Sequence, residues 1–332
     1  MEVLRTPDER FANLSGYPFD PNYIDVAAED GTPIRIHYLD EGPRDGEPIL
    51  CMHGQPSWSF LYRKMIPLLT EAGYRVIAPD LVGYGRSDKP ASEDDYTYRS
   101  HVDWMSQWLR ALDIKDLTLV CQDWGGLIGL RVASDHLDRF KRIVVANTGL
   151  PASDRITDEV SAMLGEFEKT IPVPTVDEVR EQVGSGAPGG FLYWVKYCKA
   201  SPDFSVRDVF GMMSGIEDEA VLDGYEAPFP DASYMAGARQ FPSLVPLLPR
   251  HKQDREDNDA AWAKLETFEG PVLTAFSNND PVTAGGAVPF QERLKGARGR
   301  DHPTIDGGGH FLQEGAATPL SEAIIKFMAE TA

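Results

Sequence analysis

A carboxylate is expected at the apex of a strand–turn–helix pattern in the first half of the chain. The apolar run Leu117 to Val120 stops just before Asp123, and a helical pattern with three glycines follows at once. Small residues beside the apex allow a strained turn to pack closely. A carboxylate is a weak acyl nucleophile, because it would form a labile anhydride, but it can displace a leaving group from saturated carbon and form an ester. The pattern predicts hydrolytic opening of a carbon–halogen bond or an epoxide, with Asp123 as the nucleophile.

Two more side chains follow predicted strands further along the chain. Asp280 comes after one late strand, and His310 follows a run of three glycines after the last strand. Asp123, Asp280 and His310 thus have the order nucleophile, acid and base of the α/β-hydrolase triad. We expect His310 to activate water against the ester and Asp280 to orient the imidazole. The alternative for Asp123 is a helix cap, which explains neither the glycines nor the acid and base downstream.

The loop His53-Gly54-Gln55-Pro56 follows another predicted strand. It could be a simple turn. In an α/β-hydrolase, however, this loop supplies one backbone N–H of the oxyanion hole, and the residue after the nucleophile supplies the other. That assigns Gln55 and Trp124. The leaving group separates the two chemistries, since an epoxide oxygen needs a proton donor, commonly a pair of Tyr, whereas a halide needs N–H donors such as indole.

The elements that must position these residues alternate along the chain. A hairpin is expected around Asp30-Gly31. Continuous apolar runs predict buried parallel strands at 48–52, 74–79, 117–120, 142–147, 271–276 and 303–305. Helical patterns cover 57–69, 98–112, the segment after 124, 288–294 and 320–329. The alternation predicts an α/β-hydrolase fold with a mostly parallel, doubly wound sheet.

The alternation breaks between roughly Asp154 and Pro249, where the pattern is helical and no buried strand is evident. We expect residues 1–154 and 249–332 to form the hydrolase core and 155–248 to form a helical cap. The cap would cover the carboxyl edge of the sheet, where ligands bind in open α/β folds. The charged segment 251–259 is expected to be a solvated connection.

Composition limits the partners. The 332 residues carry a net charge of -20, which repels phosphate backbones and anionic lipid, so no nucleic-acid or membrane partner is expected. The N-terminus lacks a signal-peptide pattern and no run of roughly 20 apolar residues occurs, so the cytoplasm is the expected location. Three cysteines without close pairs argue against a disulfide framework or a metal site. Cys51 and Cys121 are expected to be buried, and Cys198, among polar residues, to be exposed. A monomer is the default expectation.

Four motifs together resemble the haloalkane dehalogenases: His53-Gly-Gln-Pro-Ser-Trp, Gly83-Tyr-Gly-Arg-Ser-Asp-Lys-Pro, Val120-Cys-Gln-Asp-Trp-Gly-Gly and Gly308-Gly-His-Phe. The resemblance extends from about Val3 to the C-terminal helix. It is strongest to the subfamily whose acid follows the late strand, and the other subfamily's acid position is Asn147 here. The resemblance implies that a small halogenated substrate and water give alcohol, halide ion and a proton, without a cofactor.

The resemblance also implies a halide clamp of two tryptophans. Trp124 matches one, and Trp194, in the segment 190–194 of the cap, looks like the other; Trp58 is interpreted as a packing residue. The residues that it places in the substrate pocket are Leu127, Phe191, Phe241, Pro242, Val245 and Val282.

Two alternatives stay open. An epoxide hydrolase could use the same triad with a pair of cap tyrosines, for which the candidates are Tyr193, Tyr197, Tyr225 and Tyr234. Gln122 argues against it, because epoxide hydrolases often have His before the nucleophile. The second alternative is a non-catalytic relative that binds a small ligand.

Overall fold

A central sheet organises the computed structural model, which describes residues 1–186 and 189–332. Its strands in the order of the sheet are β2 (Asn22–Ala27), β3 (Pro33–Glu41), β5 (Arg75–Pro79), β4 (Pro48–Met52), β7 (Leu117–Cys121), β8 (Phe140–Val145) and β9 (Val272–Thr274). The pairs β2–β3 and β3–β5 are antiparallel and all other neighbours in the sheet are parallel. The predicted hairpin and the mostly parallel sheet are both confirmed.

Two small sheets accompany the central one. β1 (Val3–Leu4) pairs antiparallel with β6 (Lys89–Pro90), and β10 (Phe276–Ser277) pairs parallel with β11 (Thr304–Ile305). In the central sheet, Met52 at the end of β4 pairs with Cys121 at the end of β7. The loops that carry Gln55 and Asp123 therefore leave the sheet side by side.

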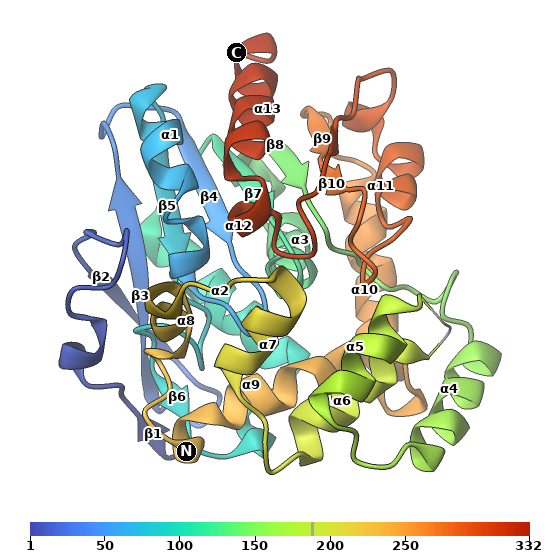
Figure 1. The fold of residues 1–332 in the computed structure, drawn as a ribbon. Coiled ribbons are helices and arrows are strands. Elements are labelled where there is room, and N and C mark those ends of the chain that lie inside the picture. Colours follow the sequence, from blue (N-terminus) through green and yellow to red (C-terminus); the bar gives the residue numbers. More distant parts are fainter. Residues whose placement is uncertain (187–188) are drawn as a thin grey trace.

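Helices cover both faces of the sheet (Figure 1). The α-helices of the core are α1 (Met65–Glu71), α2 (Tyr98–Leu112), α3 (Trp124–Asp135), α10 (Lys252–Leu265), α11 (Ala287–Arg293), α12 (Leu312–Gly315) and α13 (Ala317–Glu330). α1 packs against α13, and α3 packs against both α2 and α10. The central strands β4 and β7 are buried almost along their whole length, as continuous apolar runs in a doubly covered sheet require.

A block of helices separates β8 from β9 in the sequence. It contains α4 (Asp158–Thr170), α5 (Val176–Gly184), α6 (Gly190–Ala200), α7 (Val206–Ser214), α8 (Glu219–Glu226) and α9 (Ala236–Gln240). No strand occurs in the described parts of this block, 155–186 and 189–248. Figure 1 shows these helices together at one end of the sheet.

The prediction of a solvated connection at 251–259 is wrong, because His251 ends a short 3-10 helix and residues 252–259 begin α10. The buried side of the helix includes Arg255, Asn258, Ala261, Trp262 and Leu265. Their spacing is helical, but the first two are polar, so the apolar periodicity that reveals an amphipathic helix is missing from the first half. Trp262 donates through Nε1 to the backbone oxygen of Leu150, which anchors the loop after β8.

A buried ion pair ties the helical block to the core. The Glu314 carboxylate of α12 accepts hydrogen bonds from the Arg63 guanidinium and from the hydroxyl of Tyr225, which belongs to α8. The ammonium of Lys64 lies 2.7 Å from the same carboxylate. The side chains of Arg63 and Glu314 are each only 3% exposed, so each charge depends on the other for compensation.

The carboxylate of Asp80 is also buried in the core, with no exposed surface. It accepts hydrogen bonds from the backbone N–H of Ser59 at 2.8 Å and of Arg86 at 2.8 Å, and it lies 2.7 Å from Nδ1 of His37. Burial raises the pKa of Asp80, but His37 and the other donors outweigh it and lower the pKa to about 2.

All three cysteines are buried and free. The expectations for Cys51 and Cys121 are confirmed, whereas the expected exposure of Cys198 is wrong, because its helix α6 turns this side chain into the core beneath its polar neighbours. Within residues 1–186 and 189–332, no helix has the length and apolar character needed to cross a membrane.

Candidate active site

Asp123 occupies a sharp turn between β7 and α3. Its φ of 51° and ψ of -130° are unusual for a residue with a side chain, and such strain costs about 1–3 kcal/mol. The side chain makes no capping hydrogen bond to α3, so the alternative of a helix cap is wrong. Instead, Oδ1 of Asp123 accepts a 2.7 Å hydrogen bond from the backbone N–H of Gln55.

Two glycines after Asp123 let α3 pack against neighbouring loops. A Cβ on Gly125 would lie 2.1 Å from the backbone oxygen of Met52, and one on Gly126 would lie 2.1 Å from Oγ1 of Thr148. Neither approach is sterically tolerable. Thr148 also donates through Oγ1 to the backbone oxygen of Asp123 at 2.6 Å. The strained turn is therefore held by close packing and by hydrogen bonds.

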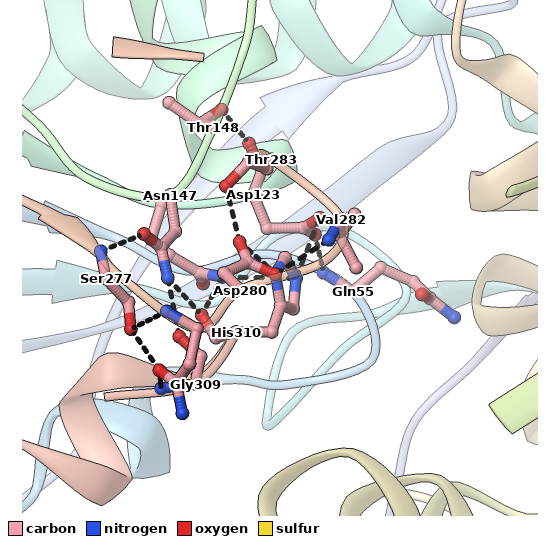
Figure 2. Close-up of polar contacts among 12 residues, drawn as sticks. Gln55, Asp123, Asn147, Thr148, Ser277, Asp280, Val282, Thr283, Gly309 and His310 are labelled. Carbon is pink, nitrogen blue, oxygen red and sulfur yellow. Dashed lines mark hydrogen bonds and ion pairs between the residues drawn. The ribbon is translucent and has the colours of Figure 1, made fainter. Parts of the chain in front are cut away.

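The three predicted triad residues meet at the carboxyl end of the sheet (Figure 2). Nε2 of His310 lies 3.5 Å from Oδ2 of Asp123, and Nδ1 of His310 lies 3.1 Å from Oδ2 of Asp280. Asp280 is itself fixed by the backbone N–H of Val282 at 2.9 Å and by the hydroxyl of Thr283. The two ring nitrogens of His310 therefore face two carboxylates, Nε2 toward Asp123 and Nδ1 toward the buried Asp280.

The charges of this group are strongly coupled. Burial lowers the pKa of His310, but the carboxylates of Asp280 and Asp123 outweigh it and raise the pKa to about 10. Burial raises the pKa of Asp280, but the facing imidazole and its hydrogen-bond donors bring that pKa below its ordinary value. Both carboxylates therefore favour the protonated form of the His310 imidazole.

The two backbone N–H groups expected in the oxyanion hole lie next to the nucleophile. That of Gln55 already reaches Oδ1 of Asp123, and the Gln55 side chain is held by its own 3.0 Å hydrogen bond to the backbone oxygen of Ala238. Trp124 is the first residue of α3. The backbone N–H groups in the first turn of a helix have no acceptor within the helix, so the N–H of Trp124 is available to another group.

A cavity of about 310 Å³ opens beside Asp123. Phe241 was expected in the wall of this cavity but is not among its lining residues. It is fully buried, and its ring centroid lies 5.0 Å from that of Trp124. The expectation is corrected because Phe241 supports Trp124 within the core. The lining includes the other predicted residues, Leu127, Phe191, Pro242, Val245 and Val282, together with Trp124 and Trp194.

A second cavity, of about 140 Å³, also reaches Asp123 and has a wall that the sequence reasoning missed. Four apolar side chains of α5 and α7 form it: Val179, Val183, Met212 and Met213. The only sequence signal is the spacing of four between the two valines, which is equally typical of any core-facing helix.

Two of the tryptophans have indole N–H groups suited to a ligand. Trp124 and Trp194 line the cavity beside Asp123 and are 2% and 7% exposed, and within the described residues neither Nε1 donates to a protein acceptor. Nε1 of Trp58 and of Trp262, in contrast, donates to backbone carbonyl groups at 3.0 and 2.9 Å. Trp58 is thus a packing residue, as predicted.

The cap tyrosines do not reach the nucleophile, since no tyrosine is among the described residues that line either cavity. The hydroxyl of Tyr225 is bound to Glu314, and that of Tyr197 donates to the backbone oxygen of Asp203 at 3.1 Å. The pair of tyrosine hydroxyls commonly used to protonate an epoxide oxygen is therefore absent from the described lining of both cavities.

Comparison with known proteins agrees with this geometry. Residues 47–172 match the family model for the alpha/beta hydrolase fold. The chain is 47% identical to a haloalkane dehalogenase of Psychrobacter cryohalolentis, covering 99% of this chain and 98% of that protein, and 44% identical to haloalkane dehalogenase 1 of Mycobacterium tuberculosis over the full length of both. It also resembles the solved tetrameric structure of the haloalkane dehalogenase DpaA from Paraglaciecola agarilytica, with a TM-score of 0.74, 32% identity and 97% coverage of each chain.

Proposed function

The chain belongs to the haloalkane dehalogenase family, and from this premise we propose how its residues cleave the carbon–halogen bond. Oδ2 of Asp123 attacks the carbon that bears the halogen, and the halide leaves with the bonding electrons. The product is an alkyl ester of Asp123. The observation that carries this assignment is the carboxylate at a strained apex that faces an apolar cavity, with Oδ1 engaged by the backbone N–H of Gln55 and Oδ2 3.5 Å from Nε2 of His310.

The leaving halide is held by the indole N–H groups of Trp124 and Trp194. Both rings line the cavity, and both N–H groups lack a protein acceptor in the described chain. A cavity wall of apolar side chains strengthens such hydrogen bonds, because water does not compete for the ion. Val245, Phe191 and Leu127 supply part of that wall.

The second step uses His310 and water. His310 takes a proton from water through Nε2 while the water oxygen bonds to the ester carbonyl carbon, and Asp280 stabilises the imidazolium that forms. The N–H groups of Gln55 and Trp124 stabilise the negative charge that develops on Oδ1. The ester bond then breaks and the imidazolium gives its proton to the departing oxygen, so that the alcohol leaves with the former Oδ2. Water supplies the new carboxylate oxygen, and its second proton is released when the carboxyl group ionises. No cofactor enters this scheme.

Replacement of the base tests the scheme. His310→Ala is expected to release about one equivalent of bromide from 1,2-dibromoethane and then to stall as the alkyl-enzyme. Mass spectrometry of a digest should place the adduct on Asp123, and Asp123→Asn is the matched control that should give neither burst nor adduct. A His310→Ala enzyme that turns over at the wild-type rate, or that carries its adduct elsewhere, contradicts the scheme.

We also propose the division into a core, 1–154 and 249–332, and a cap, 155–248, because the helices between β8 and β9 supply one wall of the cavity and the sheet supplies the other. A cytoplasmic monomer is the proposed state. Light scattering after size-exclusion chromatography tests the monomer. A mass four times that of one chain would instead indicate a tetramer, as in the DpaA structure.

A further inference from the structure

The side chain of Asn147 joins two segments that carry triad residues (Figure 2). Its Nδ2 donates to the backbone oxygen of Gly309 at 2.7 Å and to that of His310 at 3.0 Å. Its Oδ1 accepts from the backbone N–H of Ser277 at 2.8 Å, at the start of the loop that leads to Asp280. One amide therefore connects the base loop to the acid loop.

The backbone of Asn147 reaches the third segment. Its carbonyl oxygen accepts a 3.0 Å hydrogen bond from the backbone N–H of Asp123, at the strained turn. Asn147 is itself at a φ of 37° and is completely buried. Asn tolerates this left-handed backbone region better than most residues. The position thus touches the nucleophile, acid and base segments, although it takes no part in the proposed bond changes.

The chemistry of the contacts requires a carboxamide. Two carbonyl oxygens need an N–H donor on one side and a backbone N–H needs an acceptor on the other, and a primary amide supplies both. A carboxylate would turn acceptor atoms toward two carbonyls, and an apolar side chain would leave the backbone oxygen of Gly309 and the backbone N–H of Ser277 without this partner. The backbone oxygen of His310 receives a further 3.1 Å hydrogen bond from Nε2 of Gln122, so two amides fix the base from one side.

We propose that Asn147 is a positioning residue for the second half-reaction, in which it holds His310 at the distance and angle needed to activate water. This inference rests on the proposed function, in which His310 acts only after Asp123 has been alkylated. Loss of the amide should therefore slow ester hydrolysis and leave alkylation largely unchanged. A misplacement of about 1 Å in a catalytic group can cost on the order of 100-fold in rate.

Asn147→Gly is the most direct test, because Gly accepts the positive φ and removes only the side chain. In rapid-quench experiments with 1,2-dibromoethane, the bromide burst should stay within about 3-fold of wild type. Hydrolysis of the alkyl-enzyme should slow by about 10- to 100-fold, and the ester on Asp123 should accumulate. Asn147→Ser keeps one hydrogen-bond donor, so its rate of ester hydrolysis should lie between those of the wild type and Asn147→Gly. If Asn147→Gly does not fold, the hydrolysis rate of Asn147→Ser tests the proposal instead.

Asn278→Ala is the matched control. This amide also joins the two late loops, through Asp306 at 2.9 Å and the N–H of Gly307 at 3.0 Å, but it contacts neither His310 nor Asp280. It should lower stability without selective slowing of hydrolysis. Equal slowing of both steps in the Asn147 variants, or wild-type hydrolysis in both, overturns the proposal. Failure of the proposed function itself would look different, since His310→Ala would then give no burst and no ester.

Discussion

Replacement of Trp194 by Phe should weaken halide binding through the loss of one hydrogen-bond donor. The change keeps an aromatic ring in the wall of the cavity, so the main loss is the indole N–H, which has no acceptor in the described protein. A hydrogen bond to a charged group contributes about 1.5–3 kcal/mol. At about 1.4 kcal/mol for each factor of ten, the dissociation constant for bromide should rise roughly 10- to 150-fold.

Isothermal titration with sodium bromide measures this constant without depending on tryptophan fluorescence. Trp58→Phe is the matched control, because Nε1 of Trp58 donates to the backbone oxygen of Gly224 away from the cavity lining. That variant should lose stability and keep its bromide affinity. An unchanged affinity in Trp194→Phe, or an equal loss in both variants, would show that Trp194 is not the second donor of the clamp.

Three further predictions follow from buried charges. Asp123→Asn should lower the pKa of His310 below about 10, because one of the two carboxylates that raise it is neutralised; an unchanged imidazole titration by NMR would refute the coupling. Glu314→Gln should lower the free energy of unfolding in urea by about 3 kcal/mol, since it leaves the Arg63 charge without its buried partner; a loss under about 1 kcal/mol would contradict this. The pKa of Asp80 is lowered on folding, so its contribution of about 2 kcal/mol is present above about pH 4 and is lost toward pH 2. Asp80→Asn should reduce the decrease in the free energy of unfolding between about pH 4 and about pH 2. An unchanged decrease would show that other groups cause the acid sensitivity.

The meeting of the triad could be predicted because it follows from the geometry of the sheet. Asp123 follows β7 of the central sheet, whereas Asp280 and His310 follow β10 and β11, which pair in parallel with each other and so bring the acid and base segments together. The helix predicted at 98–112 appears with those bounds as α2, since its apolar stripe is regular. The regular apolar periodicity of the helices and the positions of the strand ends were therefore enough to predict most of the core elements.

The parts that could not be predicted depend on partners distant in the chain. Val179 and Met212 look like ordinary core residues of their helices, and only the packing of α5 beside α7 places them in the cavity wall. Phe241 was placed in the pocket by resemblance, but it is absent from the cavity lining and its ring packs edge-on against that of Trp124. Asn147 had no assigned role, because its partners Ser277 and His310 lie 130 and 163 positions away.

The high pKa of His310 raises the question of how an imidazolium could act as a base. In the proposed scheme the substrate supplies the answer, because alkylation converts the Asp123 carboxylate into a neutral ester. Two of the interactions that raise the pKa of His310, the hydrogen bond and the charge of Asp123, then disappear, while burial continues to lower it. The base is thus released only when its substrate, the ester, exists. In that scheme a protonated His310 beside ionised Asp123 cannot accept a proton from water, so the 3.5 Å contact between the two groups favours alkylation before water activation.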